Sequence, residues 1–243
     1  MFEIEGKGVY YRDLNRMIRE AVEKGEKQIR VTNVNGQYYI GDGLSGKPTI
    51  TIEGVPGNDL AAFMDGPTLI IKANAQDNIA NTMNSGKVVI HGNAGDVLGY
   101  GMRGGRLHVL GDVGYRVGIH MKGMKRQCPT IIVGGCAGDF FGEYLAGGVL
   151  ILLGLDAAGP VVGDYLGTGM HGGVIYVRAE VDKKMCGAEV GVLDLEDEDL
   201  KVLRGELAEY CEDFGLDIEE IMKKEFKKLL PVSSRPYGNL YAY

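Results

Sequence analysis

The chain has 243 residues, 45% of them hydrophobic and 24% charged, and is therefore long enough to bury a substantial core. Its formal net charge of −7 argues against nucleic acid as a partner, because binding to a phosphate backbone requires a basic surface. The sequence shows no signal peptide and no apolar run of the roughly 20 residues that span a bilayer, so we expect a cytoplasmic protein without a membrane segment. The 4 cysteines have neither C-x-x-C spacing nor the density of a disulfide framework, which is typical of a reducing compartment.

Residues 1–40 are predicted to form an N-terminal cap of one helix and one strand. Apolar residues recur at helical spacing over residues 14–22, Asp13 is available as the N-cap, and Gly25 ends the pattern. Residues 28–32 follow with the composition of a short β-strand. We expect this cap to cover one end of the segment that follows it.

Residues 41–180 contain a repeat and hold most of the 39 glycines of the chain. In each unit two apolar residues flank one outward position, and successive pairs are separated by 19, 19, 19, 24, 19 and 25 residues. The pairs are Ile50/Ile52, Leu69/Ile71, Val88/Ile90, Leu107/Val109, Ile131/Val133, Leu150/Leu152 and Ile175/Val177. A glycine or an alanine stands two positions after every pair.

Each unit predicts a short strand with two inward apolar side chains, closed by a tight glycine turn. Units this short and this rich in glycine cannot supply the apolar stripe of a helix. The fold class is therefore mainly β: a right-handed parallel β-helix, or solenoid, of about seven coils of ~19 residues with helical caps. The glycines expected at the corners of the coils are Gly92, Gly99, Gly101, Gly104, Gly105, Gly111, Gly135, Gly142, Gly147, Gly148, Gly154, Gly172 and Gly173.

Two stretches of the repeat are spelled like a dinucleotide-binding fingerprint, Gly99-x-Gly101-x-x-Gly104 and Gly167-x-Gly169-x-x-Gly172. That fingerprint joins a strand to a helix in a βαβ unit, whereas both stretches here precede a predicted coil strand. Solenoid corners are the favoured interpretation, and a dinucleotide site is the alternative. The stretch Gly41-x-x-x-x-Gly46-Lys47 begins like a P-loop, but Pro48 replaces the Ser or Thr that would bind magnesium.

Acidic and aromatic residues stand side by side in two successive coils, as Glu143-Tyr144 and Asp164-Tyr165, at what the sequence presents as matching points. Paired carboxylates can carry out acid/base chemistry when they lie a few ångströms apart. A stacked polar row on one face of the solenoid is the favoured alternative, and these residues are candidates for an interface.

The histidines and cysteines give no metal-binding pattern. His91, His108, His120 and His171 lack i, i+4 spacing and differ in phase, so each is expected at the rim of the solenoid. Cys128 and Cys136 flank the longer fourth interval, where two thiols alone would make a weak metal site. We therefore predict no catalytic, cofactor-binding or metal site in this chain.

Residues 181–243 are predicted to form a helical extension. One apolar stripe covers residues 200–214, and a second covers residues 218–230 and is stopped by Pro231. We expect both helices to pack on the solenoid. The last segment adds two candidate interface residues, Arg235 and Tyr237.

With these motifs in view, the chain resembles the GXGXG domain, the C-terminal β-helix of the large subunit of glutamate synthase. The resemblance covers nearly the whole chain and rests on Gly41-Asp-Gly-Leu-Ser-Gly46, Gly57-Asn-Asp-Leu-Ala-Ala-Phe63, Gly99-Tyr-Gly-Met-Arg-Gly-Gly105, residues 138–148 and residues 169–177. Because no amidotransferase or flavin domain accompanies these motifs, the chain looks like the free-standing subunit of a split, archaeal-type glutamate synthase. It departs from the family pattern at residues 115–121 and in the insertion at residues 159–167.

The resemblance implies a non-catalytic subunit that braces two partners, a glutaminase of the class II amidotransferase type and a synthase subunit. Together such partners convert glutamine and 2-oxoglutarate to glutamate, and they, rather than this chain, would bind FMN and iron–sulfur clusters. The β-helix subunit of formylmethanofuran dehydrogenase shares the motif and is the alternative. A third hypothesis is an independent solenoid binding module, although the outward strand positions lack the rows of exposed acidic and aromatic residues that it would need. A homo-oligomer also stays open, because uncovered edge coils tend to pair.

Overall fold

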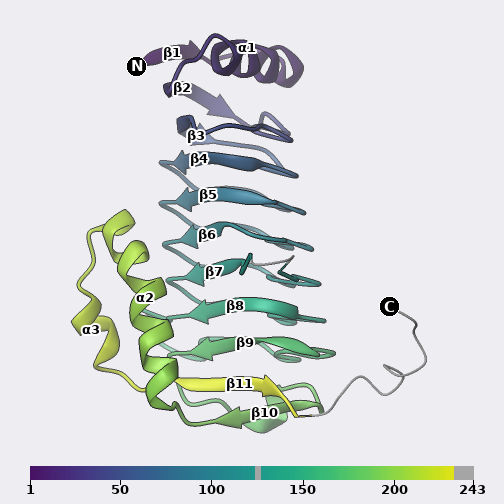
Figure 1. The fold of residues 1–243 in the computed structure, drawn as a ribbon, viewed down its shortest axis with the longest axis vertical. Helices are drawn as coiled ribbons and strands as arrows, with labels where there is room; N and C mark the ends of the chain where they lie inside the picture. The colour runs from purple at the N-terminus through teal and green to yellow at the C-terminus, as the bar shows by residue number, and fades with distance from the viewer. Residues whose placement is uncertain (124–126, 233–243) are drawn as a thin grey trace.

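The computed structural model describes residues 1–123 and 127–232 as a tall stack of strands, with one helix at its N-terminal end and two helices beside its C-terminal half (Figure 1). The elements in chain order are β1 (Phe2–Glu5), α1 (Tyr11–Glu23), β2 (Gln28–Asn35), β3 (Thr49–Val55), β4 (Asp65–Ile71), β5 (Ser85–Ile90), β6 (Arg106–Val109), β7 (Thr130–Val133), β8 (Ala146–Leu152), β9 (Gly172–Val177), the 3₁₀ turn η1 (Lys183–Met185), β10 (Val190–Leu193), α2 (Asp197–Phe214), α3 (Ile218–Met222) and β11 (Lys227–Pro231). In the described residues the strands form one 11-stranded sheet in the order β1-β2-β3-β4-β5-β6-β7-β8-β9-β11-β10. None of the helices described is both long enough and apolar enough to cross a membrane.

The predicted parallel solenoid is confirmed. Strands β3 to β9 carry the seven apolar pairs in register, so that Ile50 aligns with Leu69 and Leu69 with Val88. These three inward side chains are 0% exposed. Burying one such side chain contributes roughly 1.5–3 kcal/mol, which makes the inner rows the main source of stability. Seven strands enclose six complete turns, so the structure has about six turns where the spacing predicted about seven coils.

Asparagine and aspartate side chains join successive turns at one corner of the solenoid. Asn74 Oδ1 accepts a hydrogen bond from Asn93 N at 2.9 Å, and Asn93 Oδ1 accepts one from Asp112 N at 2.9 Å. An added Cβ at Gly92 would overlap the Asn74 oxygen, and one at Gly111 would overlap the Asn93 oxygen. Glycine is therefore required beside each rung of this ladder.

A second ladder of the same kind lies three residues further along each turn. Asp77 Oδ1 accepts a hydrogen bond from Asp96 N at 2.9 Å, and Asp96 Oδ1 accepts one from Tyr115 N at 2.8 Å. An added Cβ at Gly95 would overlap the Asp77 carboxylate oxygen, and one at Gly114 would overlap the Asp96 carboxylate oxygen. Part of the high glycine content thus follows from side-chain ladders, and the rest from turns.

Helix α1 lies across the N-terminal end of the stack and buries one face against the first turns (Figure 1). The buried residues are Leu14, Ile18 and Ala21. The helix begins earlier than predicted, because Tyr10 occupies the N-cap position and Asp13 lies inside the first turn. There Asp13 accepts a hydrogen bond from Arg16 at 2.9 Å, so its carboxylate supports the helix from within rather than capping it.

The N-terminal strands extend the sheet beyond the repeat. The strand predicted at residues 28–32 continues to Asn35, because its last residues still pair with β3. Strand β1, which the sequence did not predict, pairs with β2 in parallel register. Four residues are too few to give a recognisable alternation, so this strand is specified by the free edge of β2.

Helix α2 packs across the outward face of the strands, as predicted for the first apolar stripe of the tail (Figure 1). Its residues Leu203, Leu207 and Tyr210 are 0% exposed and form a second core with outward side chains of β7, β8 and β9. Leu200, which the stripe included, is 39% exposed, so the apolar contact begins at Leu203. Tyr210 Oη donates a hydrogen bond to the Val109 carbonyl at 3.1 Å, which satisfies its buried hydroxyl.

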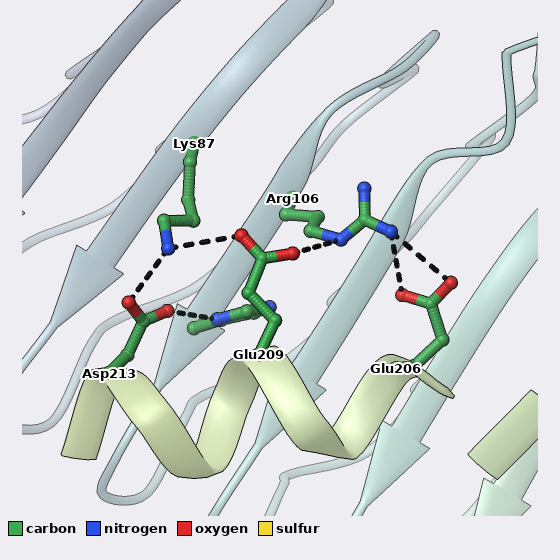
Figure 2. A network of polar contacts seen from close by, with 6 residues as sticks. Lys87, Arg106, Glu206, Glu209 and Asp213 are labelled. Atoms are coloured by element: carbon green, nitrogen blue, oxygen red, sulfur yellow. Dashed lines mark hydrogen bonds and ion pairs between the residues drawn. The ribbon is translucent and has the colours of Figure 1, made fainter. Parts of the chain in front are cut away.

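Charged side chains seal the C-terminal half of α2 to β5 and β6. Figure 2 shows Lys87 between Asp213 and Glu209, with Nζ at 2.7 Å and 3.0 Å from their carboxylates. Arg106 approaches Glu209 at 2.7 Å in the same row. His108 Nδ1 lies 2.7 Å from Asp213 Oδ2.

The prediction of a rim position for His108 is wrong. His108 is 0% exposed, because α2 covers the outward strand position that it occupies. Burial alone would raise the pKa of Asp213, but hydrogen bonds from His108 and Lys87 outweigh burial and lower it. The carboxylate therefore stays ionised between its two nitrogen partners.

The second predicted tail helix is wrong over most of its length. Helix α3 has only 5 residues, and residues 227–231 form β11 instead. This strand runs antiparallel to both β9 and β10, and Leu229, which aligns with Ile175, is 0% exposed. The free edge of the last coil strand needs a hydrogen-bonding partner, and this requirement overrides the helical spacing of the apolar residues.

Candidate partner-binding surface

Columns of residues with left-handed backbone conformation run along the turns of the solenoid, and two of these columns carry aromatic side chains. Backbone hydrogen bonds align the members of each column from turn to turn. The first column consists of Tyr39, Asp59, Asn78, Val97, Arg116, Phe140 and Tyr165. The second, four residues later in each turn, consists of Gly43, Phe63, Thr82, Gly101, His120, Tyr144 and Gly169. Their φ angles lie between 52° and 75°.

Aromatic side chains stack within these two aromatic columns. The rings of Phe140 and Tyr165 are stacked with centroids 4.7 Å apart, and the Arg116 guanidinium lies 4.4 Å from the Phe140 centroid on the preceding turn. In the second column His120 and Tyr144 stack at 5.1 Å. Stacked rings and a cation over a ring face favour one ordered arrangement of the exposed side chains.

The aromatic side chains are not needed for the turns that they occupy. A left-handed conformation costs a residue with a Cβ roughly 1–2 kcal/mol, and Gly101 and Gly169 show that glycine serves the same positions. Phe63 and Tyr165 nevertheless remain 55% exposed there, and Tyr144 is 44% exposed. Strain of this kind is characteristic of functional positions, and exposed aromatic residues are enriched where proteins bind partners.

The two acidic–aromatic pairs are not at matching points, contrary to the sequence prediction. Tyr144 N donates to the Thr168 carbonyl at 2.8 Å and belongs to the second column, whereas Tyr165 belongs to the first. Glu143 is 6% exposed and forms an ion pair with Arg116, while Asp164 is exposed. The two carboxylates thus have different surroundings and lie at different positions of their turns.

All but one of the predicted corner glycines fall into two groups. The first has left-handed φ and consists of Gly99, Gly101, Gly105, Gly142, Gly148, Gly154 and Gly173. The second lacks that conformation but leaves no room for a Cβ, and consists of Gly92, Gly104, Gly111, Gly135 and Gly172. Gly147 belongs to neither group, since the nearest atom to an added Cβ lies at 3.4 Å.

The fingerprint-like stretches at residues 99–104 and 167–172 lead into strands β6 and β9, without a helix at which a pyrophosphate could bind. Within residues 1–123 and 127–232 no group of three or more His, Cys, Asp and Glu side chains is placed to hold a metal ion. Arg235 and Tyr237 lie outside the residues that the structure describes.

The aromatic columns were not predicted from the sequence, because only the outward positions of the strands were considered as a binding face. The signal lies in the turns, where residues such as Phe140 and Tyr144 stand four apart around an inward residue, Phe141. Exposed aromatic rows are therefore present in this solenoid, although in the turns and not on the strands.

Comparison with known proteins identifies the family. A family model described as the GXGXG motif matches residues 12–233. The chain belongs to the GXGXG motif family. A relative from Methanocaldococcus jannaschii, the uncharacterized protein MJ1350, is 44% identical over 248 aligned positions that cover 98% of this chain and 95% of the relative. The matched range covers the solenoid, α2 and all of α1 except its first residue.

Proposed function

We propose that this chain is a non-catalytic scaffold subunit of glutamate synthase, acting in the cytoplasm. In this role it braces a glutaminase subunit and a synthase subunit that binds FMN and iron–sulfur clusters. Membership of the GXGXG family supports the assignment, because the resemblance drawn from the sequence ties this motif to the β-helix of glutamate synthase.

One observation carries the scaffold role: exposed aromatic side chains occupy left-handed positions where glycine would serve the fold as well. The aromatic columns extend from Tyr39 near the N-terminal cap to Tyr165 near the last coil. A partner that docks along them would contact most turns of the solenoid at once. Large aromatic side chains give such an interface most of its binding energy when they become buried.

The test separates binding from folding by returning column positions to glycine. The variant Phe63→Gly/Tyr144→Gly/Tyr165→Gly removes three exposed rings and relieves the backbone strain at each site, so the isolated chain should fold normally. Thr82→Gly, in the same column as Phe63 and Tyr144, is the matched control because it removes no ring. Each tagged chain is purified from its native cells, and the co-purifying chains and the absorption spectrum are recorded.

We expect the unmodified chain and Thr82→Gly to yield a yellow-brown complex with a glutaminase and a flavin/iron–sulfur protein. The triple variant should elute alone, with a thermal unfolding temperature close to that of the unmodified chain. A complex that survives the triple substitution contradicts the role of the columns. Recovery of a molybdenum or tungsten protein would assign the chain to the formylmethanofuran dehydrogenase type instead, and a colourless lone chain would contradict both assignments.

A further inference from the structure

A groove lies between the α2–α3 junction and the corner of the solenoid, and none of its lining residues belongs to the aromatic columns. It encloses about 710 Å³ and extends from His91, after β5, to Arg178, after β9. A second hollow of about 380 Å³ shares Leu110 and Asp156 with it and continues along the same corner. This volume accommodates a small organic molecule.

Apolar side chains contributed by three parts of the chain line the groove. Leu110 and Leu155 come from the turns after β6 and β8, and Leu216 and Ile221 come from the α2–α3 junction and α3. Gly92, Asn93 and Gly111 form the solenoid side of the groove. The groove therefore offers an apolar surface for an aliphatic or aromatic group.

Arg178 is the single Lys or Arg that lines the groove in the described part of the chain. Its Nε donates to the Ile221 carbonyl at 2.8 Å, and Nη1 lies 3.4 Å from the Leu153 carbonyl. Burial lowers the pKa of Arg178, and no carboxylate among the described residues offsets this effect. Since a guanidinium stays charged in proteins, Arg178 presents a fixed positive charge whose natural complement is a carboxylate.

His91 does not add a second positive charge to the groove. Burial and the charge of Lys72 lower the pKa of His91, and its Nε2 lies 2.8 Å from Lys72 Nζ. The imidazole is thus neutral at physiological pH and accepts a hydrogen bond from the lysine. One carboxylate, and not two, matches the cationic side of the groove.

Carboxylates line the rest of the polar edge. Asp156 and Glu220 lie on opposite sides, one after β8 and one on α3. Asp217 caps α3 with one oxygen, Oδ1, which accepts from Glu219 N at 2.9 Å, and so keeps the other oxygen for a ligand. An ammonium group is the complement of these acceptors.

We propose that the groove binds a free α-amino acid with an apolar side chain. Its carboxylate would pair with Arg178, its ammonium group with the carboxylates at the groove edge, and its side chain would lie on Leu110 and Leu155. This inference does not depend on the role in glutamate synthase, because the groove shares no residue with the aromatic columns and the test uses the isolated full-length chain.

The experiment measures binding of L-leucine by calorimetry, alongside two analogues that each lack one charge. N-acetyl-L-leucine keeps the carboxylate without the ammonium group, and L-leucinamide keeps the ammonium group without the carboxylate. Each missing charge should weaken binding roughly tenfold or more, since hydrogen bonds to charged groups carry that much discrimination. L-glutamate should also bind more weakly, because its side chain brings a second negative charge.

Variants assign the two charges to residues. Arg178→Gln should weaken L-leucine roughly tenfold and leave L-leucinamide unchanged. Asp156→Asn/Glu220→Gln, at two positions that are not buried in the fold, should weaken L-leucine but not N-acetyl-L-leucine. Asp164→Asn, outside the groove, is the control and should bind like the unmodified chain. The proposal is overturned if L-leucine shows no saturable binding, if both analogues bind as tightly as L-leucine, or if the groove variants leave its affinity unchanged.

Discussion

Gly99 and Gly101 provide a direct test of how the turns of this solenoid are built. Both have left-handed φ, 67° and 56°, and both belong to the stretch that resembles a dinucleotide fingerprint. An alanine Cβ at position 99 would overlap Ile131 Cδ1, whereas at position 101 the nearest atom, Thr82 Oγ1, lies at 3.7 Å. The two substitutions therefore share the backbone strain and differ in packing.

The expected losses follow from these two contributions. Gly101→Ala should lower the free energy of unfolding by about 1–2 kcal/mol through the left-handed conformation alone. Alanine is tolerated in the column of Gly99, because Ala61 and Ala80 occupy it with φ of 65° and 60°. Gly99→Ala adds about 1–3 kcal/mol of overpacking against the fully buried Ile131, for a total of roughly 2–5 kcal/mol.

Equilibrium unfolding in urea measures both values, with thermal unfolding as a second assay. In a chain of this size each kcal/mol corresponds to a shift of roughly 2–4 °C in the unfolding temperature. Ile131→Val removes the overlapping Cδ1, so in that background the cost of Gly99→Ala should approach the cost of Gly101→Ala. Equal losses for the two alanine variants, or no rescue by Ile131→Val, would refute the claim that position 99 is packed against Ile131 and position 101 is open.

Three further predictions concern single sites. Burial raises the pKa of Asp42 from 3.8 to about 7, so the folded state holds this proton more tightly than the unfolded state. The free energy of unfolding should therefore fall as the pH rises from about 4 to about 7. Urea titrations across that range should show a shallower fall for Asp42→Asn. Gly205→Ala, on the exposed face of α2 where nothing lies within 4 Å of an added Cβ, should stabilise the chain by about 0.5–1 kcal/mol, and an unchanged or lower unfolding temperature would contradict this. Tyr210→Phe should lower the free energy of unfolding, measured in urea, by about 0.5–1.5 kcal/mol, because it removes the hydrogen bond to the Val109 carbonyl. Tyr210→Ala should lower it several times more, because it also opens a cavity.

The inner rows of the solenoid could be predicted because each strand repeats the same chemistry at a fixed interval. Ile50, Leu69 and Val88 are separated by 19 residues and stack in register, as spacing alone required. The aspartate and asparagine ladders carried the same signal, since Asn74 and Asn93 also lie 19 apart, but their role depends on side-chain oxygens that periodicity of apolar residues does not reveal.

The tail shows where local sequence loses its predictive value. Residues 218–230 have helical spacing, and yet Leu229 is buried in a strand because β9 offers an open edge that only the assembled fold creates. His108 was misplaced for a related reason, since its outward position is exposed in a bare solenoid and buried once α2 packs there. The aromatic columns depend on the left-handed turns, which become visible only when successive turns are aligned.

Helix α2 changes the cooperativity of the solenoid. A stack of repeats normally gains stability only between neighbouring turns, so its ends can open one turn at a time. Here the helix is joined to β5 through Lys87 at its C-terminal half and to β9 through Asp199, which accepts a hydrogen bond from Tyr176 at 2.7 Å near its N-terminus. Opening any turn between β5 and β9 must disturb the contacts of α2 with these strands. The amide protons of these turns should therefore exchange together with those of α2. Strands β3 and β4, which contribute no residue to the core under α2, should exchange as a separate and less protected unit.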